Sequence, residues 1–199
     1  MFFPLLVGCT VSSTIYIAHV PKSGGTVLTK SLKECGFNVV DAERTTTETP
    51  KITVLRDPLS HIPSMYAHCR AAKYSPHKDV PRGDNVSHGF NLWLDAALKE
   101  APVSNNLHFG FKSCYRPWQF QTTFLGGDLG TAIAALDSYT VGVDPTTLLA
   151  HYNCTAVNFT HGLWPKIKNL TVEETRKVVQ VAGADMALYA YAKRISEFL

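Results

Sequence analysis

The sequence predicts an α/β protein with three layers, in which helices flank a central, mainly parallel β-sheet. Short β-branched segments alternate with segments of helical spacing, an alternation typical of parallel sheets. Two of the predicted strands end in short polar loops, where parallel sheets carry their ligand sites. The 199 residues, of which 45% are hydrophobic, can bury one core, so we expect a single domain over residues 1–199.

The first of these loops follows an apolar strand segment over residues 14–20. It reads Pro-Lys-Ser-Gly-Gly-Thr over residues 21–26. A buried strand that leads through such a loop into a helix presents unpaired backbone N–H groups, which bind anions. We therefore predict a phosphate site. Nucleotide-binding P-loops carry their lysine after the last glycine, whereas Lys22 precedes both glycines, so the order argues against an ATPase or GTPase.

The segments after this loop continue the alternation. Leu28, Leu32 and Cys35 follow helical spacing, and a glycine ends that helix. A compact β-branched run predicts a further strand that ends at Arg56. In this half of the chain the predicted elements are a helix over residues 26–35, strands over 37–40 and 51–55, a helix that continues over 66–73, and a helix over 90–99.

The second half is less regular. Asp144 and Pro145 are typical of a helix start, and Thr171 with Glu174 has the spacing of a capping box. Residues 111–125 are aromatic and irregular, whereas the polar segment 74–88 predicts a loop, either a lid over an acceptor site or a mobile surface loop. The predicted elements are a helix over residues 127–136, a strand over 138–143, a helix from 144, a helix over 171–182 and a last helix over 185–198.

Two motifs resemble those of a known family. Residues 21–26, preceded by His19, resemble the 5′-phosphosulfate-binding loop of sulfotransferases, particularly the membrane-associated, carbohydrate-modifying enzymes of the Golgi. Arg56, with Ser64 eight residues later, resembles the family's 3′-phosphate-binding motif. The chain is thus similar to enzymes that use 3′-phosphoadenosine-5′-phosphosulfate (PAPS) as sulfuryl donor. The resemblance implies a P-loop-NTPase-like sulfotransferase fold and transfer to a hydroxyl or amine of a carbohydrate-type acceptor.

The resemblance also assigns roles to residues. Sulfuryl transfer needs in-line attack on sulfur, and negative charge grows on the oxygen that leaves with the product, PAP. Lys22 would neutralise that oxygen, and the arginine fork of Arg56 suits the 3′-phosphate. No metal is required. The donor-binding residues expected on this basis are Lys22, Ser23, Gly24, Gly25, Thr26, Val27, Arg56 and Ser64.

The sequence leaves two residue types open for the base that takes the acceptor's proton, a carboxylate and a histidine. Several sulfotransferases place a catalytic glutamate roughly twenty residues after the loop cation, which favours Glu43. Others use histidine, so His61 and His68 are the alternatives. His19 is expected to pack inside the junction of the first strand and the loop as a hydrogen-bonded core residue, rather than to ionise.

Weaker resemblances occur later in the chain. Residues 121–125 loosely resemble a family element, with Thr123 where the family has arginine. Residues 185–189 are similar to a terminal family signature whose role is structural. Lys166 and Lys168 lie in a segment that resembles the loop closing over the donor's 3′-phosphate, although plain solvated lysines would look the same.

Two other functions fit parts of the pattern. The chain could be a PAP-binding or glycan-binding module without catalysis, because 199 residues is short for the family. A P-loop nucleotide kinase or NTPase agrees less well with the loop, because Lys22 precedes its glycines. A net charge of +3 without a lysine or arginine block argues against nucleic-acid binding and suits an anionic donor. The acceptor and the oligomeric state are not specified.

Features outside the loop bear on the compartment. Four N-x-[ST] sequons start at Asn85, Asn153, Asn158 and Asn169 and favour the secretory pathway, with a Golgi lumen as the first expectation and the cytoplasm as the alternative. The five cysteines lack C-x-x-C spacing, so one or two disulfides are expected rather than a zinc site. Residues 1–13 are either a remnant of a signal or membrane anchor or a first strand.

Overall fold

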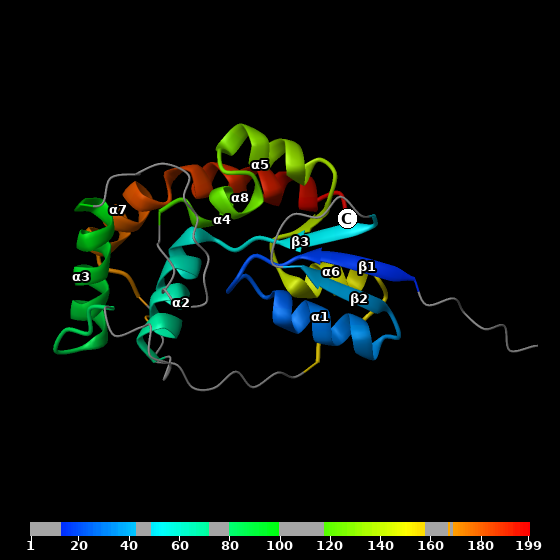
Figure 1. The fold of residues 1–199 in the computed structure, drawn as a ribbon, viewed down its shortest axis with the longest axis horizontal. Coiled ribbons are helices and arrows are strands. Elements are labelled where there is room, and N and C mark those ends of the chain that lie inside the picture. Colours follow the sequence, from blue (N-terminus) through cyan, green and yellow to red (C-terminus); the bar gives the residue numbers. More distant parts are fainter. Residues whose placement is uncertain (1–12, 43–48, 72–79, 100–117, 158–166, 168) are drawn as a thin grey trace, which may run out of the picture.

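The structure is a computed structural model that describes residues 13–42, 49–71, 80–99, 118–157, 167 and 169–199. Its centre is a four-stranded sheet in the order β2-β1-β3-β4, and every pair of neighbouring strands is parallel (Figure 1). The predicted α/β fold with a parallel sheet is therefore confirmed. The strands are β1 (Thr14–Ala18), β2 (Asn38–Ala42), β3 (Lys51–Val54) and β4 (Thr140–Gly142).

The helices follow the predicted order with two corrections. α3 begins at Val86, inside the predicted loop 74–88, and residues 120–125 form a helix where irregular chain was predicted. The capping box at Thr171 forms as predicted. The helices are α1 (Gly25–Glu34), α2 (Pro58–Ala71), α3 (Val86–Lys99), α4 (Phe120–Leu125), α5 (Leu129–Leu136), α6 (Pro145–His151), α7 (Val172–Val181) and α8 (Gly183–Ser196).

The two faces of the sheet carry separate hydrophobic clusters. Alternate strand residues such as Ile15, Ile17 and Ile52 pack with α1 and α6 on one face. The opposite face packs against α8, with Val141 and Leu188 in the larger cluster that also includes α2, α3, α4, α5 and α7. Helices therefore cover both faces, which gives the three layers expected from the sequence.

The strand order creates a switch point between β1 and β3. After β1 the chain passes through α1 to β2 on one side, and it then crosses to β3 on the other side of β1. The register pairs Ala18 of β1 with Ala42 of β2 and with Thr53 of β3, so the three carboxyl ends lie at one edge. Ligands of open parallel sheets bind at such switch points.

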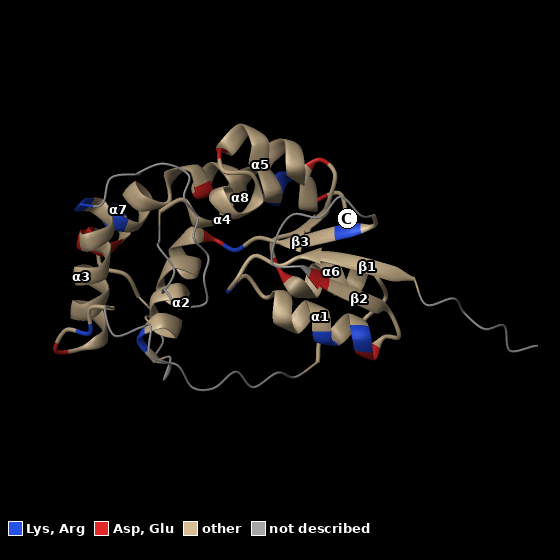
Figure 2. Cartoon of the chain, in the orientation of Figure 1, with Lys and Arg blue, Asp and Glu red and all other residues tan. Residues whose placement is uncertain are grey.

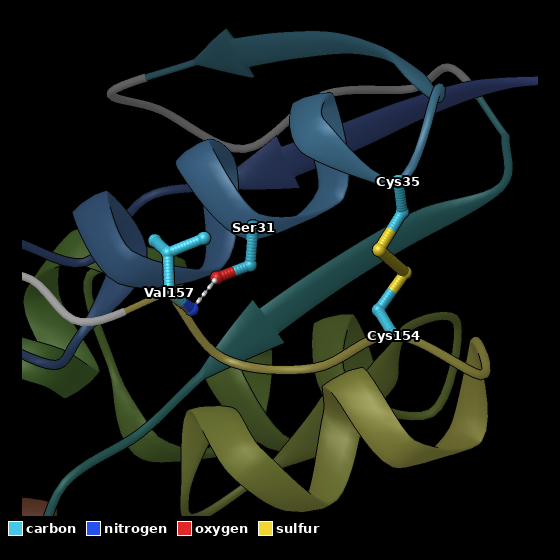
Figure 3. The surroundings of a disulfide bond; sticks show 4 residues. All are labelled: Ser31, Cys35, Cys154 and Val157. Atoms are coloured by element: carbon cyan, nitrogen blue, oxygen red, sulfur yellow. Dashed lines mark hydrogen bonds between the residues drawn. A yellow bond between two sulfur atoms is a disulfide. The ribbon is translucent and has the colours of Figure 1, made fainter.

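A disulfide joins the far ends of the two helices on one face of the sheet. Cys35 directly follows α1 and Cys154 follows α6, and their Cα atoms are 6.0 Å apart (Figure 3). Beside it, the Val157 amide donates a hydrogen bond to Ser31 Oγ of α1 over 3.1 Å. Cys69 of α2 is also disulfide-bonded. These bonds agree with the expectation of one or two disulfides.

Two features of the described residues bear on the predicted secretory compartment: the exposure of the sequon asparagines and the character of the helices. The asparagines of three sequons, Asn85, Asn153 and Asn169, are exposed, whereas Asn158 lies outside the described residues. Across the described segments, we find no helix with the length and apolar character needed to cross a membrane. Residues 1–12, which include most of the predicted anchor remnant or first strand, are outside the described part.

Removing the disulfide should destabilise the fold. We expect the Cys35→Ser/Cys154→Ser double variant to lose about 2–4 kcal/mol of unfolding free energy, because the cross-link restricts the unfolded chain. Urea denaturation under non-reducing conditions measures the loss. Ser31→Ala, which removes only the adjacent hydrogen bond to the Val157 amide, is the control and should lose less. A double variant as stable as the wild type would contradict the prediction.

Candidate functional site

The candidate site is the loop between β1 and α1, at the switch point of the sheet. Lys22 and Gly24 have positive φ angles of 65° and 106°, and Gly24 is the N-cap of α1 without a side-chain cap. Within the described residues, the amides of Gly24, Gly25 and Thr26 donate no hydrogen bond. Successive free amides in such a turn form a concave donor set that suits an anion.

Gly24 and Gly25 are needed in this loop because neighbouring side chains leave no room for a Cβ atom. A Cβ on Gly24 would lie 2.5 Å from Cγ of Pro145, the first residue of α6, and its left-handed φ also favours glycine. A Cβ on Gly25 would lie 2.3 Å from the ring of His19. The loop is thus enclosed between α6 and the end of β1.

Arg56 brings a second positive charge to the same edge. It follows β3, next to the acidic Asp57, on the connection to α2 (Figure 2). Its Nη1 donates to the Lys22 carbonyl over 3.2 Å, and its Nε donates to Ser60 Oγ over 2.9 Å. Arg56 therefore holds the loop and the first turn of α2 together.

The two cations lack a neutralising partner. In the described part of the chain, neither Lys22 nor Arg56 has a carboxylate within salt-bridge distance. Burial lowers the pKa of the Lys22 ammonium, and the charge of Arg56 lowers it further. Burial likewise lowers the pKa of Arg56, against the opposing effect of Asp57. Since two half-buried like charges destabilise each other, an anion bound here would be strongly favoured.

A cavity of about 330 Å³ opens beside the loop, within the size range of small-molecule sites. It extends from the loop across the ends of β3 and β4 to α8. Its lining combines hydroxyl and charged groups with apolar side chains. The lining residues are Ser23, Gly24, Arg56, Asp57, Ser60, Val143, Asp144, Pro145 and Tyr189.

A buried amide, which sequence reasoning did not assign to the site, fixes the backbone of Arg56. Gln121 Oε1 accepts from the Arg56 amide over 2.9 Å, and its Nε2 donates to the Arg56 carbonyl over 2.8 Å. Ser23 Oγ also donates to Gln121 Oε1, over 3.5 Å. Gln121 is fully buried, so it locks both site loops in one arrangement.

Gln121 is in turn positioned by Asp185 of α8. The two carboxylate oxygens of Asp185 accept from the amides of Gln121 and Thr122, which are free donors at the start of α4. This cap explains why the aromatic segment becomes helical at residue 120. Burial raises the pKa of Asp185 to about 6. The only sequence signal for these residues was their loose resemblance to family elements.

His61 has a supporting place rather than a catalytic one. It is fully buried in α2, and its Nε2 donates to the Pro21 carbonyl over 2.8 Å. Burial lowers its pKa to about 4, with Lys22 and Arg56 adding to the effect. Neutral, enclosed and already bonded to the loop, His61 has no access to an acceptor, and this argues against its predicted role as base.

The other predicted site residues are placed as follows. Ser64 is half-buried on α2, one turn beyond Ser60, and is not part of the cavity lining. His68 is two turns beyond His61, roughly 10 Å farther along the helix. Thr26 and Val27 are half-buried in the first turn of α1. Glu43, Lys166 and Lys168 lie outside the described residues, so their roles stay predictions.

His19 lies where β1 meets the loop, as predicted, and it is hydrogen-bonded. Its Nδ1 donates to Asp41 Oδ1 over 3.0 Å and to Oδ2 over 3.1 Å. The side chain keeps 19% of its surface exposed, so it is not enclosed in the core. Sequence reasoning did not identify Asp41 as its partner.

Comparison with known proteins finds no matching family model, no matching curated protein and no matching solved structure. The functional argument therefore depends on the site itself. Among the residues that the structure describes, no group of three or more histidine, cysteine, aspartate or glutamate side chains is arranged to hold a metal ion.

The burial of Asp185 predicts a pH-dependent stability. Its pKa is raised from 3.8 to about 6 in the folded state, so the folded chain binds more protons than the unfolded chain between these values. The unfolding free energy should therefore fall as pH rises from about 4 to 7, by about 3 kcal/mol from this group alone. Asp185→Asn removes that contribution.

Urea denaturation at about pH 4 and pH 7 tests this prediction. The wild type should lose more stability with rising pH than Asp185→Asn does. Asp84→Asn serves as the control, because Asp84 has a side chain 93% exposed and should keep the wild-type dependence. An identical pH dependence in wild type and Asp185→Asn would refute the assignment.

Proposed function

We propose that this chain is a PAPS-dependent sulfotransferase that transfers a sulfuryl group to a hydroxyl or amine of a carbohydrate-type acceptor. One observation carries the proposal: two half-buried cations, Lys22 and Arg56, meet at the switch point of the sheet, and neither has a carboxylate partner among the residues that the structure describes. The cations follow different strands. A donor with phosphate groups at both its 5′ and 3′ positions suits two such cations, whereas a single phosphate needs one.

The 5′ end of the donor would bind at the loop. The amides of Gly24, Gly25 and Thr26 suit the 5′-phosphate, because they lie at the start of α1 and donate to no described residue. Lys22 would neutralise the bridging oxygen as the bond to sulfur breaks. Its lowered pKa reflects a charge that a bound anion would stabilise.

The 3′-phosphate would bind at Arg56. The guanidinium already uses Nε and Nη1 for Ser60 and the Lys22 carbonyl, and its remaining N–H groups can donate to phosphate oxygens. The cavity beyond it has apolar walls at Val143 and Pro145, which suit the nucleoside between the two phosphates. The family resemblance implies that Ser64 binds the 3′-phosphate. In the structure, however, the serine that lines this cavity is Ser60.

The acceptor and compartment belong to the same proposal. The disulfide between Cys35 and Cys154 and the exposed sequon asparagines favour an oxidising, glycosylating compartment such as the Golgi lumen. Glycans that carry free hydroxyl groups are abundant there. The role of residues 74–88 as an acceptor lid stays a prediction, since 72–79 are not described.

Donor binding is the first test. A roughly 100-fold excess of PAP over its Kd should stabilise the wild type by about 2.7 kcal/mol, which corresponds to a rise of about 5–10 °C in Tm. Arg56→Ala should weaken PAP binding by about 10- to 100-fold, because it removes charged hydrogen bonds. Lys22→Ala should abolish transfer from PAPS. Thermal shift and release of PAP measure these effects.

The controls separate this function from the alternatives. Lys193→Ala removes an exposed cation of α8 and should bind PAP like the wild type. Equal stabilisation by ATP with Mg²⁺ would favour a phosphoryl-transfer enzyme. PAP binding without transfer to any sugar or phenol acceptor would indicate a binding module, and full activity of Lys22→Ala would refute its assigned role.

A matched pair of serine variants tests the 3′-phosphate site. Ser60→Ala should raise the Kd for PAP by about 3- to 10-fold, because the hydroxyl lines the cavity and bonds Arg56 Nε. Ser64→Ala should leave the Kd within about twofold by the same scale. Isothermal titration with PAP measures both variants, and the opposite ranking would support the serine that the resemblance implies.

A further inference from the structure

The paired side chains of His19 and Asp41 form a second polar group at the edge of the site. His19 directly follows β1 and Asp41 belongs to β2, and these two strands are neighbours in the sheet (Figure 1). Both carboxylate oxygens of Asp41 lie within 3.1 Å of His19 Nδ1. This geometry is independent of the cations and of the cavity described above.

The pairing determines where His19 can accept a proton. The ionised carboxylate can only accept hydrogen bonds, so Nδ1 carries the hydrogen and Nε2 of the neutral ring has a free lone pair. Although partial burial acts to raise the pKa of Asp41, hydrogen bonds from His19 and Thr29 and the charge of Lys33 hold it below its ordinary value. Asp41 is therefore a carboxylate at neutral pH.

The ring orientation is fixed from two further directions. Thr29 Oγ1 of α1 donates to Asp41 Oδ2 over 3.0 Å, which holds the carboxylate in place. The edge of the ring that carries Nε2 lies against Gly25, since Nε2 is only 2.6 Å from the point where a Cβ on Gly25 would lie. No described residue hydrogen-bonds Nε2.

The pair and the donor cavity lie on opposite sides of the loop. The cavity extends over β3, β4 and α8, whereas His19 and Asp41 lie over β1 and β2, at the other end of the sheet. In-line transfer requires the acceptor to approach sulfur from the side opposite the leaving oxygen. In the strand order, β2 lies on the side of β1 away from the cavity over β3 and β4, and we assign this side to the acceptor.

We propose that His19 Nε2 is the general base for the acceptor and that Asp41 positions it; this inference rests on the proposed function. As the acceptor oxygen bonds to sulfur, its proton passes to His19 Nε2. The bond from sulfur to the 5′-phosphate oxygen breaks, and its electron pair stays on PAP, where Lys22 neutralises the charge. The imidazolium then returns the proton to solvent, so charge and atoms balance.

The conservative variant His19→Asn tests the base. Asparagine can still donate to Asp41 in place of Nδ1, but it lacks Nε2. We expect release of PAP from PAPS to fall by about 100- to 10,000-fold, while the Kd for PAP stays within about threefold. The acceptors in the assay are unsulfated chondroitin, heparosan, galactose, tyramine and water, and the fastest one for the wild type is used for all variants.

His151→Asn is the control, because His151 is an exposed histidine at the end of α6 and has no assigned role in the site. It should retain the wild-type rate. Asp41→Asn should lower kcat by about 10-fold or more with an unchanged KM for PAPS, and Asp41→Glu should recover part of the loss. Thr29→Val, which removes only the support of Asp41, should have a smaller effect.

The outcomes separate this inference from the function on which it rests. If wild type binds PAP and releases it from PAPS, but His19→Asn keeps more than a third of the rate, the base is another residue and the inference is overturned. Parallel loss of PAP affinity and rate in His19→Asn would show a structural role and would also overturn it. Failure of the wild type to bind PAP or to release it with every acceptor would refute the proposed function, and the inference with it.

Discussion

The arrangement of the site depends on the unfavourable proximity of two positive charges. Lys22 and Arg56 are brought together by the crossover from β2 to β3, and the described residues supply neither with a carboxylate partner. Desolvation and mutual repulsion oppose this geometry, so other parts of the fold must hold it. Such an arrangement is expected where a ligand supplies the missing negative charge.

The supporting contacts come from segments far apart in the sequence. Gln121 bonds both backbone groups of Arg56 across 65 positions of the chain, and Asp185 holds Gln121 through the start of α4. His61 of α2 donates a hydrogen bond to the Pro21 carbonyl of the loop, and Pro145 of α6 packs against Gly24. A disulfide links the far ends of α1 and α6, the two helices whose first residues flank the loop.

The sheet also gives the site two distinct sides. The cavity lies over β3 and β4, where Arg56 and Ser60 suit a phosphate and the apolar walls suit a nucleoside. His19 and Asp41 lie on the side of β2, and the His19 Nε2, which no described residue hydrogen-bonds, lies against Gly25. The loop of residues 21–26 separates these sides. The proposed donor and acceptor sides therefore correspond to different strands of one sheet.

The sequence by itself determined the parallel α/β fold, the loop around Lys22 at the end of the first strand and the second cation, Arg56, after a later strand, because these depend on local periodicity and on motifs of a few residues. Only the tertiary structure decided that Gln121 belongs to the site, that His61 is enclosed and that His19 faces Asp41. Local sequence encodes where strands end and which amides stay free. It does not encode which distant side chains a crossover brings together, because burial and hydrogen-bond partners are set by packing between layers.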